Sequence, residues 1–376
     1  MADVTTYDVA VAGLGGFGSA AAYHLASRGL RVLGLDRYPA AHDVGASHGE
    51  SRIMRQAYYE GSAYVPLLRR TNELWERLGV DVGEQLLRRT GGLFLGRPGT
   101  RVFDGSLTSA RDWDIDHEVL DAAEVTRRFP ALRPPAGTTA LYEPDAGVLG
   151  PERAVTAHLR LAARAGADLR HDEPVISWTA ADDHVVVRTS RDSHDVGALV
   201  LTPGRWAGEL LADLAMPLRV EERIMHWFRP ADVSSFSVGA LPLWIWDRDD
   251  GTAPYGVPAL DGESVKAAVH YSTLRSADSW TGGEVAELLT ELLPGLGKDL
   301  VRSVPCTYTM TPDEDFVVGC HPAYDNVVLG CGFSGHGFKF TPVLGEVLAD
   351  LAMGRAPSYD LSIFDPRRFS VSAAPQ

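Results

Sequence analysis

The sequence predicts an α/β protein in which a domain built on a βαβ unit is interleaved with a β-rich domain. Two observations define the first domain: an apolar strand, a glycine turn and a small-residue helix open the chain, and another strand, glycine loop and helix lie near its end. A third observation, alternating apolar and polar residues over 220–280, predicts the β-rich part. The chain has 376 residues, enough for two domains that share a core.

Composition limits the kinds of function. The formal net charge of -15 disfavours binding to nucleic acid or anionic lipid, and no run of eighteen apolar residues predicts a membrane segment. No basic segment precedes the first apolar stretch, so we expect a cytoplasmic protein. The three cysteines predict neither a disulfide framework nor a metal site, and Cys320 and Cys331 are expected to be core thiols.

The opening segment, residues 7–36, is the most informative. Val9 to Ala12 reads as a strand, the helix after it ends at Gly29, and a second strand closes on Asp36. The turn contains the pattern GxGxxG, formed by Gly13, Gly15 and Gly18. Missing side chains there allow a tight turn and the approach of a pyrophosphate, and an acid roughly 20 residues further on meets a ribose hydroxyl. The segment predicts dinucleotide binding, without choosing between FAD and NAD.

Further helices and strands follow in order. Apolar spacing predicts amphipathic helices over 64–79 and 151–166 and a last helix after residue 340, while LWIWD and VKAAVHYS read as strands. We therefore assign residues 1–79, 145–219 and 310–376 to the dinucleotide domain. The β-rich domain is assigned residues 80–144 and 220–309.

Four stretches carry a family resemblance: GLGGFGSA, SHGESRIMRQAYYEG, CTYTMTPDEDF and GFSGHGFKF. Together they resemble the family of flavoenzymes that contains monomeric sarcosine oxidase and N-methyl-tryptophan oxidase, over essentially the whole chain. The resemblance implies a Rossmann-like FAD-binding domain interleaved with a substrate-binding domain. It also implies that the secondary amine of an N-methyl amino acid is oxidised by hydride transfer to FAD. Oxygen then yields hydrogen peroxide, and the imine hydrolyses to an amino acid and formaldehyde.

The resemblance also implies where FAD is held. It matches Cys306 to a cysteine that forms a thioether with the flavin ring; the alternative is a buried apolar filler. The glycine loop before the last helix is expected to direct backbone amides toward the flavin. The other positions expected to contact FAD are Gly13, Gly15, Gly16, Phe17, Gly18, Asp36, Arg37, His48, Ser51, Arg52, Val175, Gly204, Trp206, Gly332, Gly335, His336, Gly337 and Lys339.

The implied reaction needs a grip on a carboxylate and a neutral amine. By resemblance, Arg55 and Lys339 bind the carboxylate, where an arginine fork also orients it. Arg52 and Lys266 lie beside the flavin, and their positive charge disfavours the ammonium form of the substrate. Lys266 is also the cation expected to promote the reaction with oxygen.

Three further residues follow from strand periodicity. Lys266 and His270 share one face of their strand and are expected to point into one cavity, although His270 reads equally well as an interior hydrogen-bonded histidine. Tyr308 shares a face with Cys306 and is expected on the substrate side. Tyr58 and Glu60 either line the cavity or brace it.

An aromatic wall is the expected substrate contact. Trp244 and Trp246 share a strand face, with Tyr255 and Met225 in the same domain, which favours an apolar, aromatic or cyclic amine. The alternative is that the tryptophans fill the domain core.

Other functions stay open at this stage. Cyclic secondary amino acids such as pipecolate or proline are an alternative substrate class. An NAD(P)-dependent dehydrogenase and a non-catalytic flavin-binding protein are alternatives of another kind. The expected partners are a small amino acid and O2, and the resemblance implies a monomer.

Overall fold

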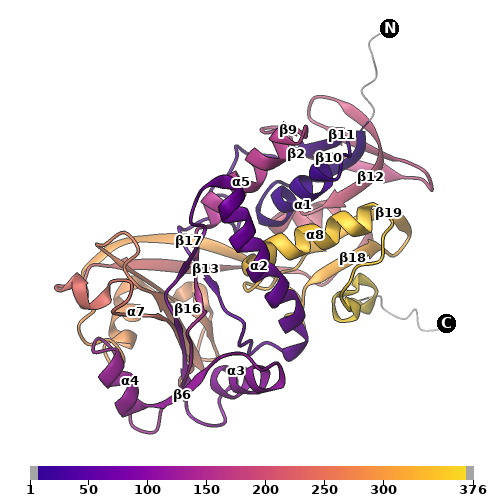
Figure 1. Cartoon of the computed structure of the whole chain (residues 1–376). Coiled ribbons are helices and arrows are strands. Elements are labelled where there is room, and N and C mark those ends of the chain that lie inside the picture. The colour runs from indigo at the N-terminus through magenta and orange to yellow at the C-terminus, as the bar shows by residue number, and fades with distance from the viewer. Residues whose placement is uncertain (1–6, 370–376) are drawn as a thin grey trace.

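The computed structural model describes residues 7–369 and contains two eight-stranded sheets and one small sheet. The predicted domain ends at residues 1 and 376 lie outside this range. Figure 1 shows the first sheet with its helices in one half of the molecule and the second sheet in the other. No helix within residues 7–369 is long and apolar enough to cross a membrane.

The first sheet is parallel at its centre. β1 pairs in parallel with β2 and β12, and β12 pairs in parallel with β19. Its strands are β1 (Tyr7–Ala12), β2 (Val32–Leu35), β9 (Asp168–Arg170), β10 (Val175–Ala180), β11 (Val185–Thr189), β12 (Ser193–Leu201), β18 (Val317–His321) and β19 (Tyr324–Cys331).

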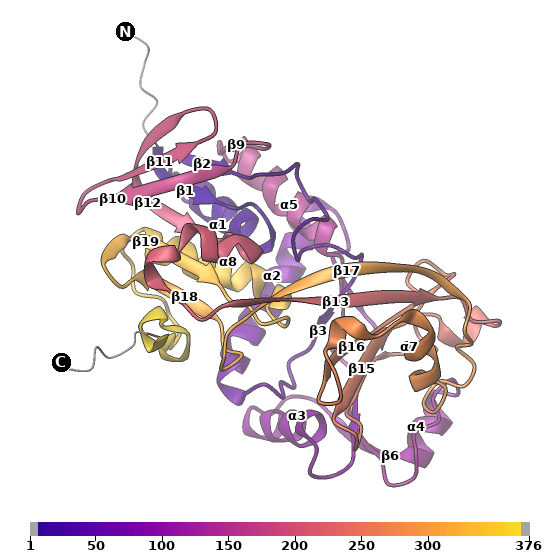
Figure 2. The same cartoon turned by 180° about the vertical axis from the view of Figure 1, so that it is seen from behind.

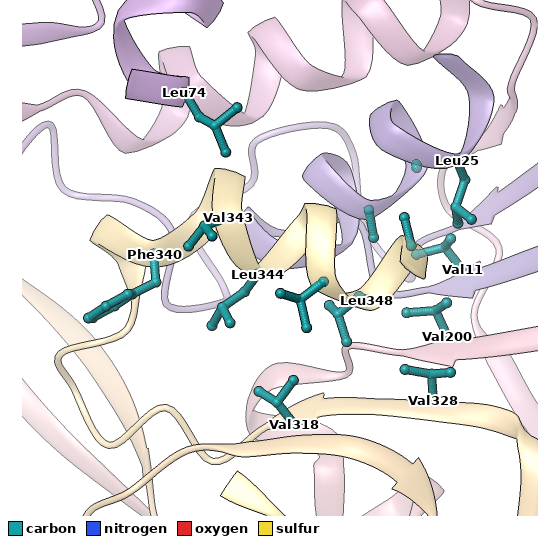
Figure 3. Packing of buried hydrophobic residues seen from close by; sticks show 14 of the residues in the cluster. Val11, Leu25, Leu74, Val200, Val318, Val328, Phe340, Val343, Leu344 and Leu348 are labelled. Carbon is teal, nitrogen blue, oxygen red and sulfur yellow. The ribbon is translucent and has the colours of Figure 1, made fainter. Parts of the chain in front are cut away.

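Three helices pack against this sheet, namely α1 (Gly16–Ser27), α5 (Pro151–Arg164) and α8 (Thr341–Ala352), and α2 (Val65–Val82) packs on α8 and α5. They confirm the predicted βαβ opening and the three predicted later helices. Figure 3 shows side chains of α8 between the strands and α1, with Leu344 on the side of Val318 and Leu348 on the side of Val200 and Val328. Burying each such leucine contributes about 1.5–3 kcal/mol, so this layer holds the glycine turn in place.

Small residues let α1 and α8 approach closely. A Cβ added at Gly345 of α8 would meet Ala20 of α1 at 2.5 Å, well inside van der Waals contact. The alanine-rich sequence of α1 therefore serves helix-to-helix packing.

The second sheet has the order β17-β13-β16-β15-β14-β5-β7-β6. Its strands are β5 (Gly92–Gly96), β6 (Glu118–Asp121), β7 (Thr139–Glu143), β13 (Arg219–Phe228), β14 (Leu243–Trp246), β15 (Thr252–Val257), β16 (Val265–Ser272) and β17 (Leu300–Met310). Apolar side chains cover both faces, because β14 sends Trp244 and Trp246 into one cluster and Leu243 and Ile245 into the other.

Two long strands link the halves. β13 and β17 pair antiparallel along their length, with Arg223 opposite Cys306, and Figure 2 shows the pair extending from the second sheet toward the first. A third sheet of β3 (Arg52–Met54), β8 (Gly147–Leu149) and β4 (Leu87–Arg89) also lies between them. The segments that carry Arg52 and Cys306 therefore meet where the two large sheets adjoin.

Helices inside the β-rich part were not predicted. They are α3 (Arg101–Asp112), α4 (Ala122–Arg128) and α7 (Gly282–Leu289). In α3 the buried face includes Ser106 and Ser109, and Gly105 lies against the backbone of Tyr59. Small and polar residues on a buried face hide the apolar spacing that would have indicated a helix. The remaining short helices are α6 (Ala207–Leu210) and 3-10 turns at Ser62–Tyr64, Gly204–Trp206, Ala212–Leu214, Val233–Phe236, Ala277–Ser279, Phe338–Phe340, Ser362–Phe364 and Pro366–Phe369.

Candidate active site

A large cavity lies at the end of the parallel strands. Its volume is about 1320 Å³ including the solvent at its mouth. The predicted cofactor positions that line it are Gly13, Gly15, Gly16, Phe17, Asp36, Arg37, Arg52, Val175, Gly204, Trp206, Cys306, Gly332, Gly335 and Gly337. We call this the dinucleotide cavity.

The glycine turn has the shape that a dinucleotide needs. Gly13 has a φ of 94°, and a Cβ there would collide with the carbonyl of Thr202. Gly18 does not line the cavity; it lies against the backbone of Gly13, where it fixes the helix close to the strand. These contacts leave space for a ligand above the backbone, and the first cavity fits FAD.

The acid at the end of β2 is buried in the wall of this cavity. Asp36 accepts hydrogen bonds from the amides of Leu14 at 2.6 Å and Tyr38 at 2.9 Å, so the carboxylate joins the glycine turn to the next loop. Arg37 lies 5.3 Å from the ring of Trp206 and pairs with Glu209. This end of the cavity offers a carboxylate and an aromatic face, as an adenosine requires.

Cys306 lies at the other end. Its thiol is only 4% exposed, and Nη2 of Arg52 donates to its sulfur at 3.3 Å. Arg52 also donates to the carbonyls of Ala46 and Ser51. The sulfur is thus placed between fixed groups and beside the positive charge of Arg52.

A second cavity adjoins the first. It measures about 740 Å³ including open solvent and shares Arg52, Cys306, Tyr308, Gly335 and Phe338 with the dinucleotide cavity. We call it the inner cavity. The predicted residues that line it are Ser51, Arg52, Arg55, Glu60, Met225, Tyr255, His270, Cys306, Tyr308, Gly335, His336 and Lys339.

Buried charge dominates the inner cavity. Nη2 of Arg55 donates to Oε1 of Glu60 at 2.6 Å, and the guanidinium lies over the rings of Tyr58 and Tyr59 at 4.3 and 4.2 Å. Burial alone raises the pKa of Glu60, but the adjacent Arg55 outweighs it and holds that pKa at about 2. This pair is therefore ionic at neutral pH.

Lys339 has no carboxylate partner among residues 7–369. Its Nζ donates to the carbonyl of His336 at 2.6 Å and lies 5.0 Å from the ring of Tyr58. Burial first, and the charge of Arg55 second, lower its pKa to about 7. This end of the cavity therefore offers a buried cation to an anionic ligand. Tyr58 lies behind both cations and braces them, while Glu60 lines the cavity.

Neutral hydrogen-bonding groups form the opposite part of the inner cavity. Nδ1 of His270 lies 3.3 Å from the hydroxyl of Tyr308, and burial lowers the pKa of His270 to about 3. Burial likewise raises the pKa of Tyr308 well above its usual value and that of Tyr255 to about 12. All three side chains are uncharged at neutral pH and can exchange hydrogen bonds without adding charge.

His336 has a defined tautomer. Its Nε2 lies 2.9 Å from the carbonyl of Glu314, which can only accept, so Nδ1 is the acceptor for the hydroxyl of Tyr58 at 2.5 Å. Burial lowers its pKa to about 4. It braces the loop that carries Lys339.

Lys266 is buried at a different place from the one predicted. It shares a strand face with His270, but its Nζ donates to Gly49 O, Ser51 O and Ser51 Oγ at 2.9 to 3.1 Å. It lines neither cavity, so the prediction that both residues point into one cavity is wrong for Lys266. Burial, then the charge of Arg52, lower its pKa well below the usual lysine value. His48 also lines neither cavity.

The two tryptophans of the predicted wall lie on the other face of their strand, whereas Tyr255 and Met225 line the inner cavity. Trp244 and Trp246 are packed in the core cluster of the second sheet, and Ile245, between them, lines the inner cavity. Successive strand side chains alternate faces, so the sequence shows that the tryptophans lie together but not on which side. The alternative, that they fill the core, is correct.

Arg223 and Tyr59 are polar residues of the inner cavity that were not predicted. Arg223 donates from Nε to His270 O at 3.0 Å and lies 4.9 Å from the ring of Tyr308, and Tyr59 lines the same cavity. Arg223 shares a period-two strand face with Met225, which was predicted, so that periodicity could have indicated it.

A dinucleotide cavity joined to a closed, cationic inner cavity defines a flavin-dependent oxidoreductase. Residues 8–351 match the family of FAD dependent oxidoreductases, and the chain belongs to that family. FAD is therefore its cofactor.

The chain is similar to several known proteins and solved structures. The chain is 44% identical to monomeric sarcosine oxidase of Streptomyces avermitilis, over 98% of this chain and 99% of that protein. It is 35% identical to N-methyl-L-tryptophan oxidase of Salmonella heidelberg, over 97% and 99%. Among solved structures it is similar to NikD, described as an unusual amino acid oxidase essential for nikkomycin biosynthesis, with a TM-score of 0.83, 27% identity and 96% and 97% coverage. The L-proline dehydrogenase of P. horikoshii has the same fold, with a TM-score of 0.83, 23% identity and 97% and 98% coverage.

Proposed function

We propose that the protein is an oxidase of the secondary amine of an N-methyl amino acid, with FAD bound covalently through Cys306. The observation that supports this best is Lys339, a cation with no carboxylate partner among residues 7–369. It lies beside Arg55 in a cavity that shares Cys306 with the dinucleotide cavity. When bound, FAD accepts a hydride and returns the electrons to O2, giving hydrogen peroxide. The imine then hydrolyses to an amino acid and formaldehyde.

The α-carboxylate of the substrate is assigned to Lys339 and Arg55. Lys339 supplies a buried ammonium that pairs with no carboxylate within residues 7–369. Arg55 supplies a planar fork whose orientation is fixed by Glu60 and by two tyrosine rings. Because two cations bind the carboxylate, the orientation of the substrate is fixed, and its amine and the carbon to be oxidised occupy one defined position.

The amine is assigned to the neutral part of the cavity. A free alkylamine titrates near about 10.4, so at about pH 8 its neutral form costs roughly 3 kcal/mol. Arg52 and Arg223 are positive and repel an ammonium, while His270 and Tyr308 are neutral partners for an amine. Binding in this cavity therefore favours the deprotonated amine, the form that can give up hydride.

Cys306 is assigned the covalent bond. Its thiol lies in the wall common to both cavities, and Arg52 holds the sulfur by a hydrogen bond. Cys320 and Cys331 line neither cavity, and burial raises both of their pKa values.

A substrate panel tests the proposal. Sarcosine, N-methylalanine, N-methyltryptophan, proline and pipecolate are offered to the purified yellow protein, and peroxide and formaldehyde are measured. Peroxide with equal formaldehyde supports N-methyl oxidation; peroxide without formaldehyde, from the ring amines, supports the cyclic alternative. Silence across the panel would leave a flavin-binding protein without oxidase activity. The NAD(P)-dependent alternative is not retained, because the family depends on FAD.

We propose further that the protein acts as a monomer in the cytoplasm. One relative is named as monomeric, and all three cysteines of this chain are free thiols. Size-exclusion chromatography with light scattering checks the monomer; a dimer mass would contradict it.

A further inference from the structure

The segment that carries Arg55 into the inner cavity has an unusual support. Residues 55–58 form no helix or strand, so their backbone amides need other partners. The amides of Gln56 and Ala57 donate to Oε1 and Oε2 of Glu143, at 2.8 and 3.0 Å. One carboxylate thus holds two consecutive peptide groups.

Glu143 reaches this segment from the other half of the molecule. It is the last residue of β7 in the second sheet, and its side chain is 0% exposed. It lines neither cavity, and therefore cannot touch the substrate in the arrangement described. Its route to the substrate site is indirect: it acts through the peptide groups that it holds and through the attraction between its carboxylate and the charge of Arg55.

That route ends at the guanidinium of Arg55. Nη1 of Arg55 donates to the carbonyl of Ala57 at 3.1 Å, and the amide of the same residue is held by Glu143. The carbonyl of Ala57 belongs to the next peptide group, so a shift of residue 57 moves the acceptor that, with Glu60, sets the direction of the fork. The next amide, that of Tyr58, is held at 2.6 Å by Ser109 of α3, so the clamp continues into the aromatic ring beneath Arg55.

We infer that Glu143 is a positioning residue for substrate binding: it clamps the 56–57 peptides and so orients the Arg55 fork toward the substrate carboxylate. The inference rests on the proposed function, because it assumes that Arg55 receives a carboxylate. A carboxylate suits this task, since each of its oxygens accepts one N–H, whereas an amide offers one acceptor and turns an N–H toward the second peptide. A purely structural glutamate would instead affect stability without affecting ligand affinity.

Three variants test this. Glu143→Gln removes one of the two acceptors, and Glu143→Asp keeps both oxygens and the charge but withdraws them by one methylene. Asp247→Asn is the matched control, because Asp247 is also a buried carboxylate that accepts a backbone amide, that of Val102 at 3.0 Å, and lines neither cavity.

The holoenzymes are compared in three measurements. These are kcat and KM for the best substrate of the panel, the Kd of methoxyacetate from the flavin absorbance change, and hydrogen exchange of a peptide spanning residues 55–60. Methoxyacetate has the carboxylate and size of sarcosine but no amine. We expect Glu143→Gln to raise KM and Kd about tenfold with kcat within about twofold, and to accelerate exchange in 55–60. Glu143→Asp should lie between it and wild type, and Asp247→Asn should leave KM and Kd unchanged.

Unchanged KM and Kd in Glu143→Gln would overturn the inference, as would an equal rise in Asp247→Asn, which would indicate general loosening. If Glu143→Gln does not fold, Glu143→Asp decides by the same criteria. A wild-type protein that turns over no panel substrate and binds no methoxyacetate would sink the proposed function itself. Turnover with an unaffected Glu143→Gln sinks only the positioning role.

Discussion

The dinucleotide cavity and the inner cavity are built by different means. The first is shaped by backbone: glycines at 13 and 18 leave room where any Cβ would collide. The second is shaped by charged side chains removed from water, namely Arg55, Glu60 and Lys339, from two distant parts of the chain. The dinucleotide cavity therefore depends on close packing, and the inner cavity depends on electrostatics in a dry environment.

Because of this difference, the two cavities should respond to different kinds of substitution. The dinucleotide cavity should lose its shape when a side chain is added at one of its glycines, and this effect should not depend on pH. A cavity of buried charges keeps its shape but changes its affinity when a charge is removed or a proton moves. Cys306 and Arg52 belong to both cavities and join the two kinds of construction.

The sharpest way to break the first cavity is Gly18→Val. The added side chain would collide with the carbonyl of Gly13 and the hydroxyl of Thr202, so we expect a loss of at least about 4 kcal/mol of stability or no folded holoprotein. The flavin absorbance of the purified protein measures the outcome. Gly283→Ala in α7, where a Cβ would meet nothing within 4 Å, is the control and should remain yellow. Normal flavin content in Gly18→Val would contradict the backbone account.

The shared wall is tested by Cys306→Ser. Because serine cannot form the thioether, we expect the flavin mass on the intact chain to disappear completely, while flavin still binds reversibly in the cavity. Mass spectrometry and acid precipitation measure this. Cys320→Ser should keep the flavin mass, since Cys320 lines neither cavity. A wild-type chain without added flavin mass would remove the covalent part of the proposal.

The inner cavity should respond to pH through Lys339. Its pKa of about 7 means that the cation is present below pH 7 and is lost above it, while a carboxylate ligand stays ionised. We expect the affinity for methoxyacetate to fall by up to about tenfold for each pH unit above 7. Lys339→Met should bind it more weakly at pH 6 and lose this dependence. A pH-independent Kd in the wild type would argue against Lys339 as the carboxylate site.

The smallest effect is expected from Trp244→Phe. Its Nε1 has no hydrogen-bond partner within residues 7–369, so phenylalanine loses volume but removes an unpaired donor. We expect a cost of about 1–2 kcal/mol in unfolding free energy and no change in substrate preference. Met225→Ala is the comparison: Met225 lines the inner cavity, so the ratio of kcat/KM between sarcosine and a bulky N-methyl amino acid should change about tenfold. A changed substrate preference in Trp244→Phe would indicate that the tryptophan contacts the substrate after all.

The sequence by itself determined the helices, strands and turns that form through interactions between residues close together in the chain. The βαβ opening with Gly13 and Asp36 and the helices α2, α5 and α8 follow from local periodicity and turn geometry, which act over a few residues. Motif resemblance added Cys306, Arg55 and Lys339 as candidates. Tertiary structure decided how they are used.

Only the tertiary structure decided which strand face points where. Pairing placed Ile245, and not Trp244, against the inner cavity, and it turned Lys266 onto the 49–51 backbone. It also brought Glu143 to Arg55, a link with no local pattern. The physical reason is that period-two alternation defines two faces but not their surroundings, and that burial and charge pairing arise between segments that are distant in the chain.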